Sequence, residues 1–166
     1  MMNSHDAASP PTGVEIERKF LLLNVPEEVL AAPGVSVRQG YLVVGTQEEA
    51  RIRQADDAYT LTVKSGAGIR RGEYEIALSR EQFASLWPAT EGRRIEKRRH
   101  AVPLPGDLVA EVDLYDGPLA GLAVAEVEFV SLDRARAFEP PGWFDADVTD
   151  DGRYKNAALA RDGRPS

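Results

Sequence analysis

Acidic and basic residues recur along this sequence as pairs of like charge separated by a single residue. Six pairs of this kind occur: Glu15/Glu17, Arg51/Arg53, Glu73/Glu75, Lys97/Arg99, Glu111/Asp113 and Glu126/Glu128. Clustered basic side chains bind phosphate oxygens, and clustered carboxylates bind hard divalent cations such as Mg²⁺ or Mn²⁺. A phosphorylated small molecule that carries a divalent metal could therefore pair with the basic and the acidic side chains at once. A single ion could pair with only one of the two kinds.

The spacing of these pairs is that of a β-strand, in which residues two apart point to the same face. The residue inside each pair is mostly apolar, as at Ile16, Ile52, Tyr74, Val112 and Val127. Each strand is therefore expected to have one apolar face and one charged face. Two like charges ~4 Å apart repel by on the order of 4 kcal/mol at an effective dielectric near 20. That cost favours acidic strands facing basic strands across a shared interior over a set of separately solvated faces.

Eight segments have the β-branched content, the alternation and the bounding turn residues that are typical of strands. They are residues 14–22, 37–44, 48–54, 58–65, 71–77, 93–101, 108–115 and 123–130. Short connections favour antiparallel pairing between successive strands, and eight such strands can close around an axial cavity. The expected fold is thus mainly β (α+β): a closed eight-stranded antiparallel tunnel barrel with peripheral helices and a charged interior.

Helical signals are fewer and lie between or after the strands. Short helices are expected at residues 26–32, 79–87, 131–138 and 153–160. The second of them begins at Ser79, with Gln82 three residues later, which is the spacing of a capping box. The apolar strand faces that point outward need cover, which is expected from Phe83, Trp87, Trp143 and Phe144.

Length and composition narrow the class of protein further. The chain has 166 residues, 43% of them apolar, which suffices for one globular domain, expected over residues 13–163 after a flexible leader of residues 1–12. Cysteine is absent and only two histidines occur, which excludes thiolate zinc sites and Ser-His-Asp triads. A net charge of −7 argues against nucleic-acid or anionic-membrane partners. No signal peptide or membrane-spanning run is found, which fits a cytoplasmic protein.

The order of the charged motifs resembles that of a known family. Residues 15–20, EIERKF, fit the ExExK signature of the CYTH superfamily, the triphosphate tunnel metalloenzymes. The other like-charge pairs follow in order, with Lys64 in a TLTVK segment and RYKN at residues 153–156. RQGYL at residues 38–42 and LWPATEGRR at residues 86–94 make the sequence most similar to the short bacterial inorganic tripolyphosphatase branch. The resemblance covers nearly the whole chain after the leader.

The resemblance implies a role for each of the charged residues. Mg²⁺ or Mn²⁺ would be bound by Glu15, Glu17, Asp113, Glu126 and Glu128. Phosphate would be bound by Lys19, Arg51, Arg53, Lys64, Lys97, Arg99 and Lys155. The basic side chains would be ordered by Glu73, Glu75 and Glu111. Lys19, Glu126 and Glu128 are the implied catalytic residues, with Glu126 or Glu128 orienting the attacking water.

The activity that the resemblance implies is divalent-metal-dependent hydrolysis of inorganic tripolyphosphate to pyrophosphate and phosphate. Two other activities use the same tunnel, namely adenylate cyclase, which converts ATP to cyclic AMP, and thiamine triphosphatase. Alternatives of a different class are a non-catalytic polyphosphate- or nucleotide-binding module and a small-ligand barrel with an apolar interior. The expected partner is a triphosphate-containing small molecule, with neither nucleic acid nor membrane, and the expected state is a monomer or homodimer.

Overall fold

The computed structural model describes residues 15–66 and 72–166, and within them eight strands form one antiparallel sheet. The strands are β1 (Ile16–Leu21), β2 (Gly34–Val44), β3 (Glu48–Ala55), β4 (Ala58–Ser65), β5 (Gly72–Ala77), β6 (Arg94–Leu104), β7 (Leu108–Tyr115) and β8 (Ala123–Phe129). Every strand expected from the sequence is present, with ends shifted by at most a few residues. The expected leader, residues 1–12, lies outside the described residues, and the boundaries of the expected domain stay a prediction.

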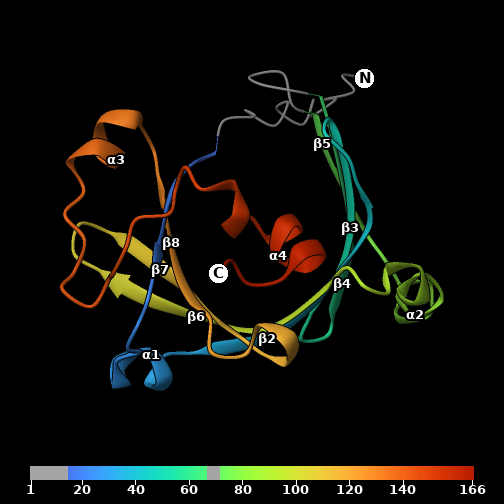
Figure 1. Cartoon of the computed structure of the whole chain (residues 1–166), viewed down its shortest axis with the longest axis horizontal. Coiled ribbons are helices and arrows are strands. Elements are labelled where there is room, and N and C mark those ends of the chain that lie inside the picture. Colours follow the sequence, from blue (N-terminus) through green and yellow to red (C-terminus); the bar gives the residue numbers. More distant parts are fainter. Residues whose placement is uncertain (1–14, 67–71) are drawn as a thin grey trace, which may run out of the picture.

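The sheet is bent into a trough, by which we mean the space along its concave face (Figure 1). In the strand order β1-β8-β7-β6-β2-β3-β4-β5, the first three strands form one arm, β6 and β2 the floor, and the last three the other arm. Lys19 lies opposite Glu126, which lies opposite Glu111, while Arg99 lies opposite Asp113. Opposite residues of antiparallel strands share a face. The register therefore joins the charged faces of successive strands into one, as the alternation predicts.

The prediction of a closed barrel is not confirmed. In the described part of the chain, β1 and β5 are the two edges of the sheet and do not pair with each other. The free edge of β1 is instead hydrogen-bonded by residues 145–149: the Leu21 amide donates to the Ala146 carbonyl at 2.9 Å, and the Val148 amide donates to the Lys19 carbonyl at 2.8 Å. Because these backbone groups are already satisfied, β5 has no ladder to join there, and the sheet remains an open trough.

Short helices lie on both sides of the sheet. They are α1 (Glu27–Ala31), α2 (Arg80–Leu86), α3 (Leu132–Ala137) and α4 (Asn156–Asp162), with 3-10 turns η1 (Trp87–Thr90), η2 (Gly117–Leu119) and η3 (Gly152–Tyr154). The predicted capping box is confirmed, since the Ser79 hydroxyl accepts from the Gln82 amide at 3.0 Å and the Ser79 amide donates to the Gln82 side chain at 2.8 Å. None of the described helices is long and apolar enough to cross a membrane.

The convex face of the sheet is covered by α1, α3 and aromatic side chains. Phe20 and Val112, which alternate with charged residues along their strands, are buried beneath this cover, and the rings of Phe20 and Phe144 lie 5.0 Å apart. On the other arm, Phe83 and Trp87 stack with their ring centroids 5.1 Å apart. Burial of each such side chain contributes ~1.5–3 kcal/mol. This packing holds the apolar face outward and so turns the charged face toward the trough.

The prediction that all helices are peripheral is wrong for α4, which lies inside the trough against the floor (Figure 1). The reason is that one end of the trough is apolar. Ile95, Tyr115 and Val124 lie on the trough face there, and Leu159 of α4 packs on them and is fully buried. The apolar contact fixes the C-terminal segment beside the charged part of the trough.

Candidate active site

Three basic side chains of the trough are held in place by carboxylates. The Lys97 ammonium lies 2.7 Å from Asp113 Oδ2, and Arg99 donates to both oxygens of Asp113 from Nε at 2.7 Å and Nη2 at 2.9 Å. Arg99 Nη1 also lies 2.9 Å from Glu111, and the Lys19 ammonium lies 3.1 Å from Glu126. Charge-assisted bonds of this kind are short and directional. These cations therefore have fixed positions before any ligand binds.

Burial sets the charge of the Lys97–Asp113–Arg99 group. Burial lowers the pKa of Lys97 to about 8, although the charge of Asp113 opposes the change. Burial alone would raise the pKa of Asp113, but the charge of Lys97 and the hydrogen bonds from Arg99 hold that pKa below its usual value. Burial likewise opposes ionisation of Arg99, and the hydrogen bonds with Asp113 outweigh it and raise the pKa of Arg99. At neutral pH the group thus keeps a net positive charge.

The basic side chains on the opposite arm have no such partners. Among residues 15–66 and 72–166, no carboxylate lies within 4 Å of the cationic nitrogens of Arg51, Arg53 or Lys64. Arg51 Nε is buried and has no hydrogen-bond partner. Burial, together with the charges of Arg51 and Arg99, lowers the pKa of Arg53 to about 10. This arm therefore carries cations whose charge is not compensated, as a binding site for an anion requires.

Carboxylates gather at the β1–β8–β7 arm. Glu17, Glu126, Glu128 and Glu111 line a cavity of about 230 Å³, together with Asp107 from the β6–β7 turn. Burial raises the pKa of Glu17, and repulsion from Glu126 adds to the effect. Glu17 and Glu128, which pair with no cation in the described residues, are thus short of positive charge, which a bound cation would supply.

The donor set fits a hard divalent cation. All donors are carboxylate oxygens, although no three carboxylates or histidines in the described residues already converge as a complete ligand set. Mg²⁺ usually keeps several waters and binds through one or two carboxylates plus substrate phosphates. Glu17, Glu126 and Glu128 fit that mode, whereas both oxygens of Asp113 are occupied by Lys97 and Arg99. Glu15, another expected ligand, does not line this cavity.

The carboxylates expected to order basic side chains differ in what they contact. Glu111 contacts Arg99, as expected. Glu75 accepts a hydrogen bond of 3.1 Å from the Thr62 hydroxyl, not from a cation. Glu73 lies opposite Lys64 in the register of β4 and β5, but no ion pair joins them in the described structure.

The C-terminal RYKN segment reaches the site through Tyr154 and Asn156, two residues of this motif for which no role was predicted. The Tyr154 carbonyl accepts from the Lys19 ammonium at 3.0 Å, and the buried Tyr115 hydroxyl donates to Asn156 at 2.7 Å. Lys155, the residue expected to bind phosphate, is exposed at the start of α4. Asp107 was also missed, although the period of two that links Glu111 and Asp113 reaches it when extended back into the turn.

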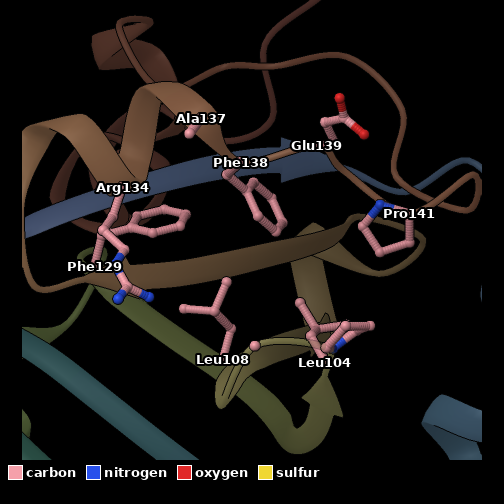
Figure 2. Close-up of a pocket in the computed structure, with 10 residues that line it drawn as sticks. Leu104, Leu108, Phe129, Arg134, Ala137, Phe138, Glu139 and Pro141 are labelled. Carbon is pink, nitrogen blue, oxygen red and sulfur yellow. The ribbon is translucent and has the colours of Figure 1, made fainter.

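A larger cavity of about 410 Å³ lies outside the trough, between α3 and the β6–β7 turn (Figure 2). Its lining is mainly apolar, with Leu108, Phe129 and Phe138 facing the space and only Arg134 and Glu139 carrying charge. It brings together none of the like-charge pairs. The trough, not this cavity, is the candidate active site.

A bent antiparallel sheet with carboxylates and basic side chains on one concave face defines a tunnel-type β protein built to bind a small charged molecule. The chain belongs to the CYTH family, since the family model of the CYTH domain matches residues 13–129.

Similar proteins with an assigned activity cover most of the chain. An inorganic triphosphatase of Nitrosomonas europaea is 51% identical over 147 residues, which are 88% of this chain and 96% of that protein. An inorganic triphosphatase of Acetivibrio thermocellus is 36% identical over 151 residues, 90% of this chain and 94% of that protein. A crystal structure of an inorganic triphosphatase matches with a TM-score of 0.74 at 48% identity, covering 89% of this chain and 95% of its own.

Proposed function

We propose that this chain is a divalent-metal-dependent triphosphatase that hydrolyses inorganic triphosphate to pyrophosphate and phosphate. The observation that carries the proposal is the separation of charge in the trough, with uncompensated cations on the β3–β4 arm and two carboxylates without a paired cation, Glu17 and Glu128, on the β1–β8 arm. Capture of a simple anion needs cations alone, and an apolar ligand needs neither. A triphosphate with its bound cation complements both arms, and the relatives named inorganic triphosphatase support this substrate.

The two kinds of basic residue have different tasks in this proposal. Arg51, Arg53 and Lys64 have their charge available and bind the phosphate chain. Lys97 and Arg99 are fixed by Asp113, so they present charge at set positions to the oxygens that become more negative during hydrolysis. Phosphoryl transfer depends mainly on such positioning and electrostatic stabilisation.

Glu17, Glu126 and Glu128 would hold Mg²⁺ or Mn²⁺ at the acidic arm. A divalent cation bound there would neutralise phosphate charge and polarise the reacting phosphoryl group. Glu126 is already engaged by Lys19, whereas Glu128 is exposed and has no cation within 4 Å in the described residues. We therefore assign to Glu128 the orientation of the attacking water. The Lys19 ammonium contacts both Glu126 and the Tyr154 carbonyl, and in this proposal it stabilises negative charge on the phosphate beside the attacking water.

A substrate panel with a metal series tests the proposal. Phosphate release is measured from tripolyphosphate, ATP and thiamine triphosphate with Mg²⁺, with Mn²⁺ and with a chelator. We expect tripolyphosphate to be cleaved fastest, to pyrophosphate and phosphate, and chelation to stop the reaction. Formation of cyclic AMP and pyrophosphate from ATP would indicate a cyclase instead, and binding of all three compounds without turnover would indicate a binding module.

Raising the pH through about 8 is expected to weaken triphosphate binding, because Lys97, whose pKa burial lowers to about 8, loses its charge there. If only the charged form binds, KM rises roughly fivefold between pH 8 and pH 9. The measurement is KM and kcat across this range at saturating Mg²⁺. A kcat that increases through pH 8 at constant KM would contradict a binding role for the charged ammonium.

Loss of the same proton from Lys97 is expected to increase the stability of the fold, although it weakens binding. The pKa of Lys97 is lower in the folded chain than the 10.5 of an unperturbed lysine, so the folded state releases this proton first. Between these two values the unfolded state binds more protons, and the contribution of Lys97 to stability increases with pH. Loss of binding above pH 8 is therefore not expected to reflect unfolding caused by Lys97, which a melting curve at each pH checks.

A further inference from the structure

A fully buried amide lies beside the uncompensated arginines of the trough. Gln39 on β2 has no exposed surface, and its position opposite Arg53 in the β2–β3 register places it on the trough face. Its side-chain oxygen accepts a hydrogen bond of 3.1 Å from Arg53 Nε, and its side-chain nitrogen donates one of 2.9 Å to the Tyr41 hydroxyl. Both hydrogen-bonding atoms of this amide are therefore used inside the protein.

The chemistry of the partners fixes which way the amide points. A guanidinium group only donates hydrogen bonds, so Arg53 requires the oxygen of Gln39. The nitrogen must then find an acceptor, and the buried Tyr41 hydroxyl supplies it. The chain Tyr41–Gln39–Arg53 holds the guanidinium by its Nε, so the terminal nitrogens of Arg53 are not used in this contact.

The trough thus orients its cations in two different ways. Lys97, Arg99 and Lys19 are held by carboxylates, which reduce their net charge. Arg53 is held by a neutral amide, which accepts the same hydrogen bond and leaves the charge intact. Burial and the neighbouring cations Arg51 and Arg99 make this charge costly to keep in the unliganded protein. Such a cost is recovered only when a strongly anionic ligand binds.

We propose that Gln39 is a positioning residue that orients Arg53 for the triphosphate while leaving its full positive charge available. The inference rests on the proposed function, because the ligand that uses this charge is the substrate of that function. The proposal predicts that triphosphate binding depends on the neutral charge of the Gln39 amide as well as on its hydrogen bonds. These two properties are separable by substitution.

Two substitutions of similar size separate them. Gln39→Glu keeps an acceptor for Arg53 but adds a negative charge, whereas Gln39→Met removes both hydrogen bonds and adds none. We expect KM for tripolyphosphate to rise on the order of tenfold to a hundredfold in Gln39→Glu, with a smaller change in kcat. The rise in Gln39→Met should be smaller. A purely structural role predicts the reverse order, since Gln39→Met loses more bonds, and that order would overturn the proposal.

The pH profile gives a second readout that a structural defect does not produce. In Gln39→Glu the rise in KM should shrink as the pH falls and the introduced carboxylate is protonated, relative to the unmodified chain at each pH. A ratio of KM values that does not vary with pH counts against the proposal.

Gln54→Glu is the matched control for Gln39→Glu. Gln54 neighbours Arg53 on β3, so its side chain points to the other face, where it donates to the Asp56 carbonyl at 3.2 Å. Its KM should stay unchanged.

Two further measurements keep the outcomes distinct. Melting temperatures show whether each variant folds; if Gln39→Glu does not, an unchanged KM in the folded Gln39→Met overturns the inference by itself. Calorimetric binding of metal-free tripolyphosphate reads the same effect without turnover. If the unmodified chain hydrolyses tripolyphosphate but Gln39→Glu binds it equally well, the inference on Gln39 fails while the proposed function stands. If the unmodified chain binds but hydrolyses no triphosphate, the proposed function fails, and the binding data still decide the role of Gln39.

Discussion

Replacing Asp113 with alanine is expected to lower the free energy of unfolding by about 3–5 kcal/mol, as does removal of one partner from other buried ion pairs. Asp113 is 1% exposed and pairs with two cations at once, Lys97 and Arg99. Without it, two positive charges remain side by side at low dielectric, with their hydrogen bonds lost. The variant should also lose triphosphatase activity, because both cations lose the contacts that position them.

Urea denaturation measures the first effect, and Glu111→Gln is its control. Glu111 also pairs with Arg99, at 2.9 Å, but its side chain is half exposed, so its removal should cost under about 1 kcal/mol. The same experiment separates two roles for Asp113. If Asp113 binds the metal, as the family resemblance implies, its replacement would weaken Mg²⁺ binding while leaving the stability of the metal-free protein nearly unchanged. That result would contradict the structural role.

Replacing Glu128 with glutamine is expected to reduce metal-dependent turnover about a thousandfold, because several kcal/mol of transition-state stabilisation depend on the bound cation and the oriented water. Glu128 lies directly opposite Glu17 in the β1–β8 register and lines the acidic cavity with it. Removing one negative charge from this cluster also lowers the pKa of Glu17, to whose increase Glu128 contributes. The fold should therefore become no less stable.

Phosphate release as a function of Mg²⁺ concentration measures the loss, and calorimetric Mg²⁺ titration shows whether the metal still binds. Glu96→Gln is a suitable control, since Glu96 is an exposed carboxylate on β6 beside Lys97 that points away from the trough toward Arg38. Its activity should match that of the unmodified chain. Full activity in Glu128→Gln at low Mg²⁺ would contradict both roles assigned to Glu128.

The strands could be predicted because one physical signal is repeated in six of the eight. Alternation of apolar and charged residues, as at Ile16 and Glu17 or Val112 and Asp113, requires the period of a strand and also specifies which face is buried. Closure of the barrel could not be predicted in this way. It depends on which backbone groups reach the free edge of β1, and residues 145–149, which do so, have no alternating pattern.

The members of the site were evident from the sequence, but their individual roles were not. Glu111 and Asp113 form one like-charge pair with identical spacing, yet only Asp113 lies deep enough to contact both Lys97 and Arg99. How deeply a side chain of β7 is buried depends on its distance from the floor of the trough, and the spacing of charged residues alone does not specify that distance. Gln39 is uncharged and gave no signal in a search for charged pairs, although it shares the trough face.

Because β1 and β5 do not pair, the distance between these two edge strands, which is the width of the mouth of the trough, is expected to vary more easily than the other dimensions of the sheet. No ladder of backbone bonds ties the two arms together among the described residues, so their separation depends on the bend of β6 and β2 and on the packing of α4 between them. Repulsion between Arg53 on β3 and Arg99 on β6 favours a wider mouth, and a multivalent anion bound between them would favour a narrower one.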